Sequence, residues 1–70
     1  YGSSFDQTLD EFGLVASATR MGDKFNRFKS LMKCASGAQV VDEKIEDTLL
    51  DLAAYAIMTV SWIKRKQNGI

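Results

Sequence analysis

The fold is decided by residues 42–66, DEKIEDTLLDLAAYAIMTVSWIKRK. This stretch contains no proline, and Asp42 at its start can cap a helix. We therefore predict a helix over residues 43–65. One of its faces repeats apolar residues at helical spacing: Ile45, Leu49, Leu52, Ala56, Val60 and Ile63.

The other sides of this predicted helix are also rich in apolar residues. Leu50, Ala53 and Ile57 cover a second side. A third side, opposite the first, collects Asp47, Asp51, Tyr55, Met58 and Trp62. A helix that is apolar on nearly all sides is buried on nearly all sides. Because three short helices cannot surround it, we expect other copies of the chain to do so, in a homo-oligomer.

Upstream of this stretch the sequence predicts two more helices, over residues 4–12 and 14–33. Gly13 separates them, and residues 34–41 read as a loop. The longer helix carries an apolar stripe that should pack against the first face of helix 43–65: Leu14, Ala18, Met21, Phe25, Phe28 and Met32. The expected fold is thus all-α, one domain over residues 1–70, with one short and two long helices in a helical homo-oligomer. Since the chain begins at Tyr1 rather than Met, we expect residues upstream to be missing.

Composition excludes several classes of function. The formal net charge is zero, which argues against DNA, RNA or an anionic membrane as a partner. There is no histidine and Cys34 is the one cysteine, so Cys/His zinc sites and histidine-based catalysis are ruled out. The apolar run 49–63 is interrupted and shorter than the ~20 residues of a membrane span. We expect a soluble protein of the cytoplasm.

Two polar clusters are candidates for a site. Asp47 and Asp51 neighbour each other at i, i+4 and repel unless something positive lies between them. They fit an ion pair with an arginine of helix 14–33, a divalent-metal or ligand site, or plain exposure to solvent. The second cluster is the basic stripe Arg20, Lys24 and Arg27, which should point away from the Phe25 and Phe28 stripe.

Guanidinium groups in a row suit phosphate oxygens, because each offers a planar fork of donors. Asp23 lies beside the basic stripe and can orient an arginine. The alternative is that these cations pair with Asp47 and Asp51, and both can hold together. Tyr55 and Trp62 fit either base stacking or, more commonly, a core or subunit interface. The run Lys64 to Lys66 reads as a solvated helix end.

Three segments, in order, resemble a phage and prophage family described as the nucleotide modification associated domain. They are Tyr1-Gly2-Ser3-Ser4-Phe5, Arg20-x-x-Asp23-Lys24-x-Asn26-Arg27 and Asp42-Glu43-x-Ile45-x-Asp47-Thr48-Leu49-Leu50-Asp51-Leu52-Ala53-x-Tyr55-Ala56. The resemblance implies a phage-encoded helical protein, in the host cytoplasm, that acts on or binds nucleotides.

The chain is also similar to MazG-like nucleoside triphosphate pyrophosphohydrolases, which hold Mg²⁺ between two acidic helices. That likeness implies Glu43, Asp47 and Asp51 as metal ligands. The first acidic pair is missing, because helix 14–33 offers only Asp23, and Asp6 and Asp10 have the wrong spacing.

Three functions follow from these observations. The first is a protein that binds a nucleotide without any cofactor and sequesters it, such as a sponge for a nucleotide signal of host defence. Its ligand contacts would be Arg20, Asp23, Lys24, Arg27, Asp47, Asp51 and Tyr55. The second is the Mg²⁺-dependent pyrophosphohydrolase, and the third is an oligomerisation module without a ligand. The incomplete acidic set favours binding.

Overall fold

The computed structural model describes residues 3–34 and 43–68. These residues form three helices and no strand, which confirms the all-α class: α1 (Ser3–Phe12), α2 (Leu14–Cys34) and α3 (Glu43–Asn68). α3 continues three residues past its predicted end. The predicted loop and the Asp42 cap fall on residues 35–42, which lie outside the described residues.

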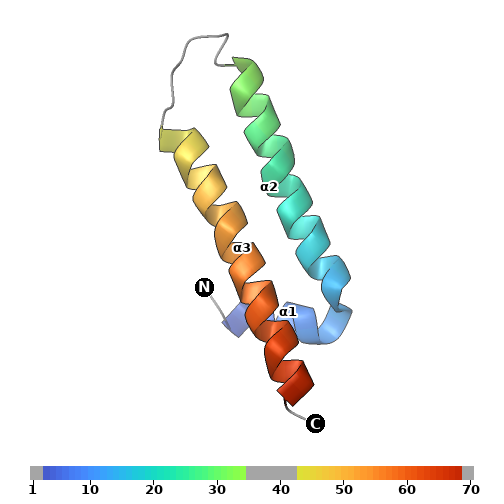
Figure 1. Ribbon diagram of the computed structural model, residues 1–70. Helices are drawn as coiled ribbons and strands as arrows, with labels where there is room; N and C mark the ends of the chain where they lie inside the picture. The colour runs from blue at the N-terminus through green and yellow to red at the C-terminus, as the bar shows by residue number, and fades with distance from the viewer. Residues whose placement is uncertain (1–2, 35–42, 69–70) are drawn as a thin grey trace.

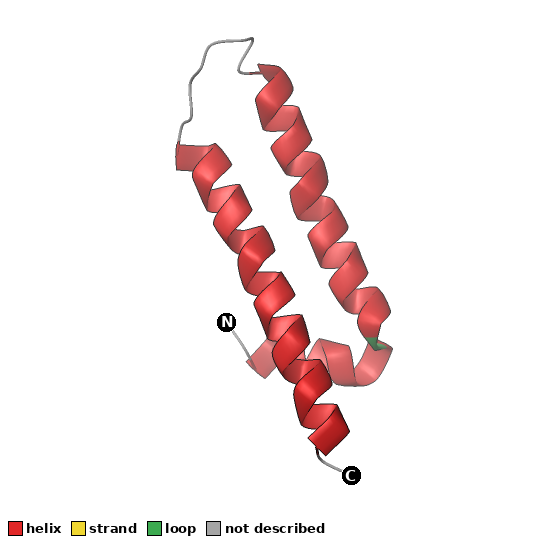
Figure 2. Cartoon of the chain, in the orientation of Figure 1, coloured by secondary structure: helices red, strands yellow, loops and turns green. Residues whose placement is uncertain are grey.

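The two long helices run antiparallel, side by side, and form an elongated hairpin (Figures 1 and 2). The short α1 lies across the end of this hairpin where α2 begins, and α3 passes in front of it in Figure 1. The molecule measures 50 × 17 × 16 Å, so it is an elongated rod rather than a sphere. Within 3–34 and 43–68, no helix combines the length and the apolar character that a membrane crossing requires.

Gly13 produces the sharp turn between α1 and α2. Its φ of 72° lies in the left-handed region, which costs a side-chain-bearing residue strain that glycine escapes. Its N–H donates to the carbonyl oxygen of Leu9 at 2.7 Å, a C-terminal cap for α1. The Ala16 N–H donates to the Gly13 carbonyl at 3.0 Å and starts α2. The predicted end of the first helix at Gly13 is therefore confirmed.

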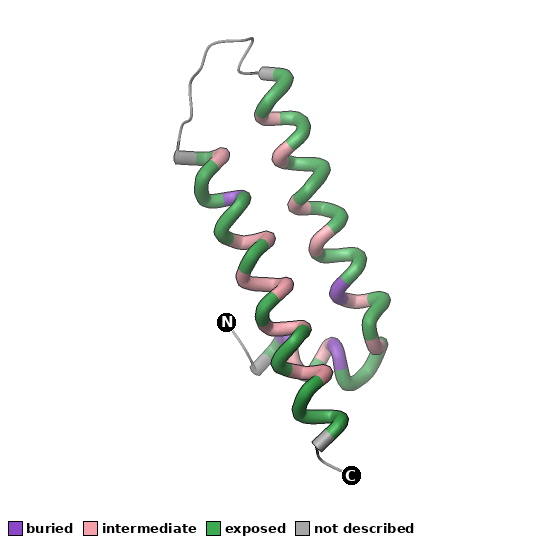
Figure 3. The backbone as a smooth tube through the Cα atoms, viewed as in Figure 1, coloured by how far each residue is buried: buried purple, intermediate pink, exposed green. Residues whose placement is uncertain are grey.

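The buried core of the described chain is small (Figure 3). Phe5 and Leu9 of α1 are its buried hydrophobic residues, and Leu9 is fully covered. Phe5 meets the ring of Tyr55 edge-on, with centroids 4.9 Å apart. Two hydroxyl residues, Ser17 and Thr48, are buried as well. Burial thus concentrates where α1 meets the hairpin.

The prediction of which stripes face each other in the hairpin holds for half of the stripe residues. Along α2 the covered and half-covered positions form a line that we call the seam, which keeps Met21 and Phe28 of the predicted stripe: Ser17, Met21, Lys24, Phe28 and Leu31. Six residues of the two predicted stripes are instead exposed: Leu14, Ala18, Phe25 and Met32 on α2, and Leu49 and Val60 on α3. Each long helix is therefore rotated by part of a turn from the expected orientation.

A hydrogen bond between hydroxyl groups explains part of this rotation. The Ser17 and Thr59 hydroxyl oxygens lie 2.7 Å apart across the seam. The Thr59 hydroxyl also reaches the Tyr55 carbonyl, at 2.7 Å, and the Ser17 hydroxyl also reaches the sulfur of Met21, at 3.5 Å. Small hydroxyl side chains let the two helices approach here, and each polar group stays satisfied.

The hairpin consequently has two unlike faces. At 100° per residue, one side of the seam collects exposed apolar residues of both long helices, and we call it the apolar face: Leu14, Phe25 and Met32 on α2, and Leu49 and Val60 on α3. Val15, Leu50 and Ile57 are also exposed, but they point away from the seam, along the outer edges of the hairpin. Arg20, Arg27, Asp47 and Asp51 fall on the other side, the polar face. α1 packs on the polar face, because its Phe5 contacts Tyr55 there. The apolar face is left uncovered by the described residues.

Candidate functional site

Lys24 and Asp51 join α2 to α3 at the edge of the polar face. The Lys24 Nζ lies 3.0 Å from Asp51 Oδ2, and the two side chains are 30% and 36% exposed. An interhelical pair for Asp51 was one of the predicted alternatives, but its partner is a lysine rather than an arginine. The expectation that Lys24 points away from the helix pair is wrong. Pairs this accessible contribute about 0–1 kcal/mol, so this one mainly fixes where the charges lie.

Arg20 and Arg27 stand on α2 within one turn on either side of Lys24. Both are exposed, and neither forms a salt bridge with any residue in 3–34 or 43–68. Their Cα atoms are about 10 Å apart along the helix axis. Two guanidinium groups therefore flank a lysine that is already held by a carboxylate.

The predicted carboxylate partners of these arginines are placed differently. Asp23 and Asp47 are both exposed, and no salt bridge joins either one to a described arginine. The structure thus brings Lys24 and Asp51 together and leaves Arg20, Asp23, Arg27 and Asp47 around them as open surface groups. Their contact with a ligand stays a prediction.

Tyr55, the remaining predicted contact, is engaged in packing. Its ring is half-buried against Phe5, at an interplanar angle of 68°. This contact attaches α1 to α3, which matches the alternative of a core role. A base would have to displace Phe5 to stack on this ring, so we leave Tyr55 out of the site proposed below.

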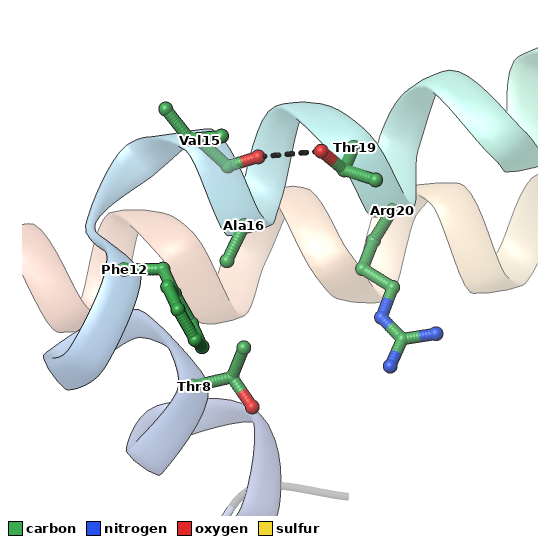
Figure 4. A pocket seen from close by; sticks show the side chains of 6 residues that line it. All are labelled: Thr8, Phe12, Val15, Ala16, Thr19 and Arg20. Atoms are coloured by element: carbon green, nitrogen blue, oxygen red, sulfur yellow. Dashed lines mark hydrogen bonds between the residues drawn. The ribbon is translucent and has the colours of Figure 1, made fainter.

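An open groove lies beside Arg20, in the angle between α1 and α2 (Figure 4). It has a volume of about 330 Å³ and six lining residues: Thr8, Phe12, Val15, Ala16, Thr19 and Arg20. The Phe12 ring is 65% exposed and forms an aromatic wall. The hydroxyls of Thr8 and Thr19 donate to the carbonyls of Ser4 and Val15, which leaves their oxygens able to accept. The groove offers an aromatic surface next to a cation.

Two carboxylates of α1 meet the basic end of α3. Asp6 pairs with Arg65 at 2.9 Å, and Asp10 pairs with Lys66 at 3.2 Å. Asp10 also accepts a hydrogen bond of 2.9 Å from the indole N–H of Trp62. This bond, followed by the one from Lys66, lowers the pKa of Asp10 below its ordinary value of 3.8. We call this set of contacts the α1 clamp.

The α1 clamp changes two predictions. The basic run at the end of α3 was expected to be a solvated helix end, but Arg65 and Lys66 pair with α1. Asp6 and Asp10 were considered as substitutes for the missing acidic pair, and they are occupied by these cations. The three salt bridges of the described residues each join a carboxylate of one helix to a cation of another.

The described part of the chain holds no group of three acidic or cysteine side chains placed to bind a metal. The predicted Mg²⁺ set was Glu43, Asp47 and Asp51. The Glu43 side chain lies outside the described side chains, so the set as a whole stays a prediction. The two members that are described do not converge on an open site, because Asp51 turns to Lys24 and Asp47 is exposed.

Comparison with known families assigns the chain. The model of the nucleotide modification associated domain 1 family matches residues 1–63 of the 70. The chain belongs to this family. No curated protein and no solved structure matches the chain.

The match to nucleotide modification associated domain 1 confirms the resemblance drawn from the three sequence segments. It spans the polar face, the groove and nearly all of α3. Sequence reasoning missed the groove, since it gave Phe12 no part in a site. The available signal was Gly13, because a turn directly after Phe12 leaves that ring at the end of the short helix.

Proposed function

We propose that the protein binds a nucleotide on the polar face, with its phosphates on Arg20 and Arg27. The observation that carries this proposal is the pair of exposed guanidinium groups around the Lys24–Asp51 pair. A charge-assisted hydrogen bond from a guanidinium to a phosphate oxygen is among the stronger polar contacts. Since Arg20 and Arg27 are about 10 Å apart along the helix, a ligand with more than one phosphate can meet both.

The groove supplies a place for the base. Arg20 is shared between the polar face and the groove, so a phosphate on Arg20 directs the rest of a nucleotide toward Phe12. Base–aromatic stacking contributes about 1–3 kcal/mol and tolerates any base. The free acceptor positions of Thr8 and Thr19 suit ribose or amino hydrogens. The family description, which ties the domain to nucleotide modification, supports a nucleotide as the ligand class.

We propose sequestration rather than hydrolysis. Hydrolysis of the MazG type needs two acidic groups facing each other around Mg²⁺. Here Asp51 is held by Lys24, and Asp6 and Asp10 are held by Arg65 and Lys66. The engagement of these three carboxylates by cations supports binding over hydrolysis. A binding protein without a cofactor needs none of them as ligands, and its place of action would be the cytoplasm of the host cell.

The test is a retention experiment. The purified chain is incubated with nucleoside triphosphates, cyclic oligonucleotides and ADP-ribose derivatives plus Mg²⁺, dialysed, heat-denatured, and the released compounds are separated by chromatography. We expect one class to be retained and released intact. Release of monophosphate and pyrophosphate would instead identify the hydrolase, and retention of nothing from this panel would contradict the proposal.

Variants locate the site. Arg20→Ala and Arg27→Ala should each weaken binding about tenfold or more, because each removes a charged hydrogen bond worth about 1.5–3 kcal/mol. Lys33→Ala is the matched control: it removes an exposed cation from the same helix, on the side away from the polar face. An equal loss in Lys33→Ala would mean nonspecific attraction. Loss of helicity in Arg27→Ala would mean that this side chain is structural.

A further inference from the structure

The outer side of α3 carries a stripe of exposed residues at helical spacing. We call it the outer stripe: Glu46, Leu50, Ala53, Ile57, Val60 and Lys64. Leu50 and Ile57 are among the most exposed large apolar residues of the chain, at 62% and 66%. Large apolar side chains that form a continuous exposed patch mark an interaction surface. Its ends are one acidic and one basic residue.

The outer stripe is symmetric about Tyr55: apolar residues pair with apolar residues, and the two charged residues at the ends have opposite signs. Leu50 and Val60 stand five residues on either side of Tyr55, and Ala53 and Ile57 stand two residues on either side. Glu46 and Lys64 stand nine residues on either side, with opposite charges. Neither Glu46 nor Lys64 forms a salt bridge with a residue in 3–34 or 43–68.

We propose that a second copy of the chain docks on this stripe, antiparallel, with a two-fold axis passing at the level of Tyr55. In a two-fold interface, residue i of one copy meets residue j of the other, and j meets i. Glu46 then meets Lys64 of the second copy at both ends, and Leu50 meets Val60 at two places between them. A parallel arrangement would place Glu46 against Glu46.

The apolar face adjoins the outer stripe. Leu14, Phe25 and Met32 are exposed on it, one helix farther from the two-fold axis than α3. The formal net charge of zero leaves no overall repulsion between copies.

The docked pair keeps both polar faces outward. Each polar face, with its Arg20 and Arg27, lies away from the contact. Dimerisation and nucleotide binding are therefore independent, and each dimer presents two sites. Trp62, for which the sequence allowed a place in the subunit interface, belongs to the α1 clamp instead.

The experiment is sedimentation equilibrium of the chain without ligand, with four variants. The wild type should sediment at twice its 7.8 kDa chain mass at micromolar concentration. Glu46→Lys and Lys64→Glu each create two like-charge contacts, so each should raise the dimer Kd on the order of tenfold. The double variant E46K/K64E restores both pairs with reversed polarity and should return to the wild-type Kd. Ile57→Glu, at the centre of the stripe, should raise it on the order of a hundredfold.

Mixing the two single variants gives the decisive result. A chain with two lysines at the ends of the stripe is complementary to a chain with two glutamates, so an equimolar mixture of Glu46→Lys and Lys64→Glu should form heterodimers at least as tight as the wild type. Circular dichroism checks that each variant keeps its helices. A monomeric wild type, single variants that dimerise normally, or a mixture no tighter than its components would each overturn the proposal.

Discussion

Replacing Leu9 by alanine tests whether α1 is held by a single buried side chain. Leu9 is 0% exposed, and Phe5 is the other buried hydrophobic residue of the described chain. Truncating a fully buried leucine costs about 2–5 kcal/mol, partly from the cavity that remains. A chain of 70 residues has a total stability of about 4–10 kcal/mol at the usual 0.05–0.15 kcal/mol per residue. Leu9→Ala should therefore remove a large fraction of the free energy of unfolding.

Urea denaturation followed by circular dichroism measures this loss. With a denaturant slope of about 1 kcal/mol/M for so small a protein, a loss of 2 kcal/mol lowers the midpoint by about 2 M. Val15→Ala is the control, because Val15 is an exposed aliphatic residue on the neighbouring helix and should change stability by less than about 0.5 kcal/mol. Both are compared at one protein concentration. A midpoint for Leu9→Ala equal to that of the control would refute the view that Leu9 anchors α1.

Two further changes probe the turn and the α1 clamp. The folded-state pKa of Asp10 is lowered, so its contribution to stability is present above the unfolded pKa of about 4 and is lost as the pH falls through the folded value. Acidification below about pH 4 should therefore shift the fluorescence of Trp62, the one tryptophan, and Asp10→Asn should remove that step; an unchanged step would contradict the role of Asp10. Gly13→Ala should cost about 1–2 kcal/mol from the left-handed backbone alone, since its Cβ would meet no atom within 4 Å. Thermal melting checks this, and an unchanged melting temperature would show that the turn relaxes.

The helix positions could be predicted from local signals, whereas the helix orientations could not. Glycine punctuation and apolar periodicity placed the helices to within three residues at their described ends. The orientation prediction assumed that the most apolar stripe of each long helix faces the other helix. Ser17 and Thr59 overrule that assumption, because their hydroxyls pair across the seam at 2.7 Å. Periodicity shows that a stripe is apolar and does not show which neighbour will cover it.

The candidate site was predictable in its charges and not in its partners. Spacing on α2 correctly placed Arg20 and Arg27 on an outward surface. Lys24 was assigned to the same surface. Its position lies on the seam, between Met21 and Phe28 along α2, so its side chain reaches Asp51 of α3. The contacts of the α1 clamp form because α1 crosses α3 near the end of α3. Residue spacing within either helix does not predict where two helices cross.

The rotations of α2 and of α3 away from their predicted orientations have one physical cause. Because 46% of the residues are hydrophobic, we predicted that the apolar stripes of the two long helices pack against each other and that other copies cover the remaining sides of α3. The hairpin instead closes on a seam that includes Ser17, Thr48 and Thr59, and leaves its large aliphatic side chains on one side. Rotating both helices inward would bury these side chains but would also break the Ser17–Thr59 bond and separate Lys24 from Asp51. A surface that a second copy can cover removes the need for that rotation. A second copy on the outer stripe covers large apolar side chains without that rotation, and the charge-swap mixture tests this dimerisation.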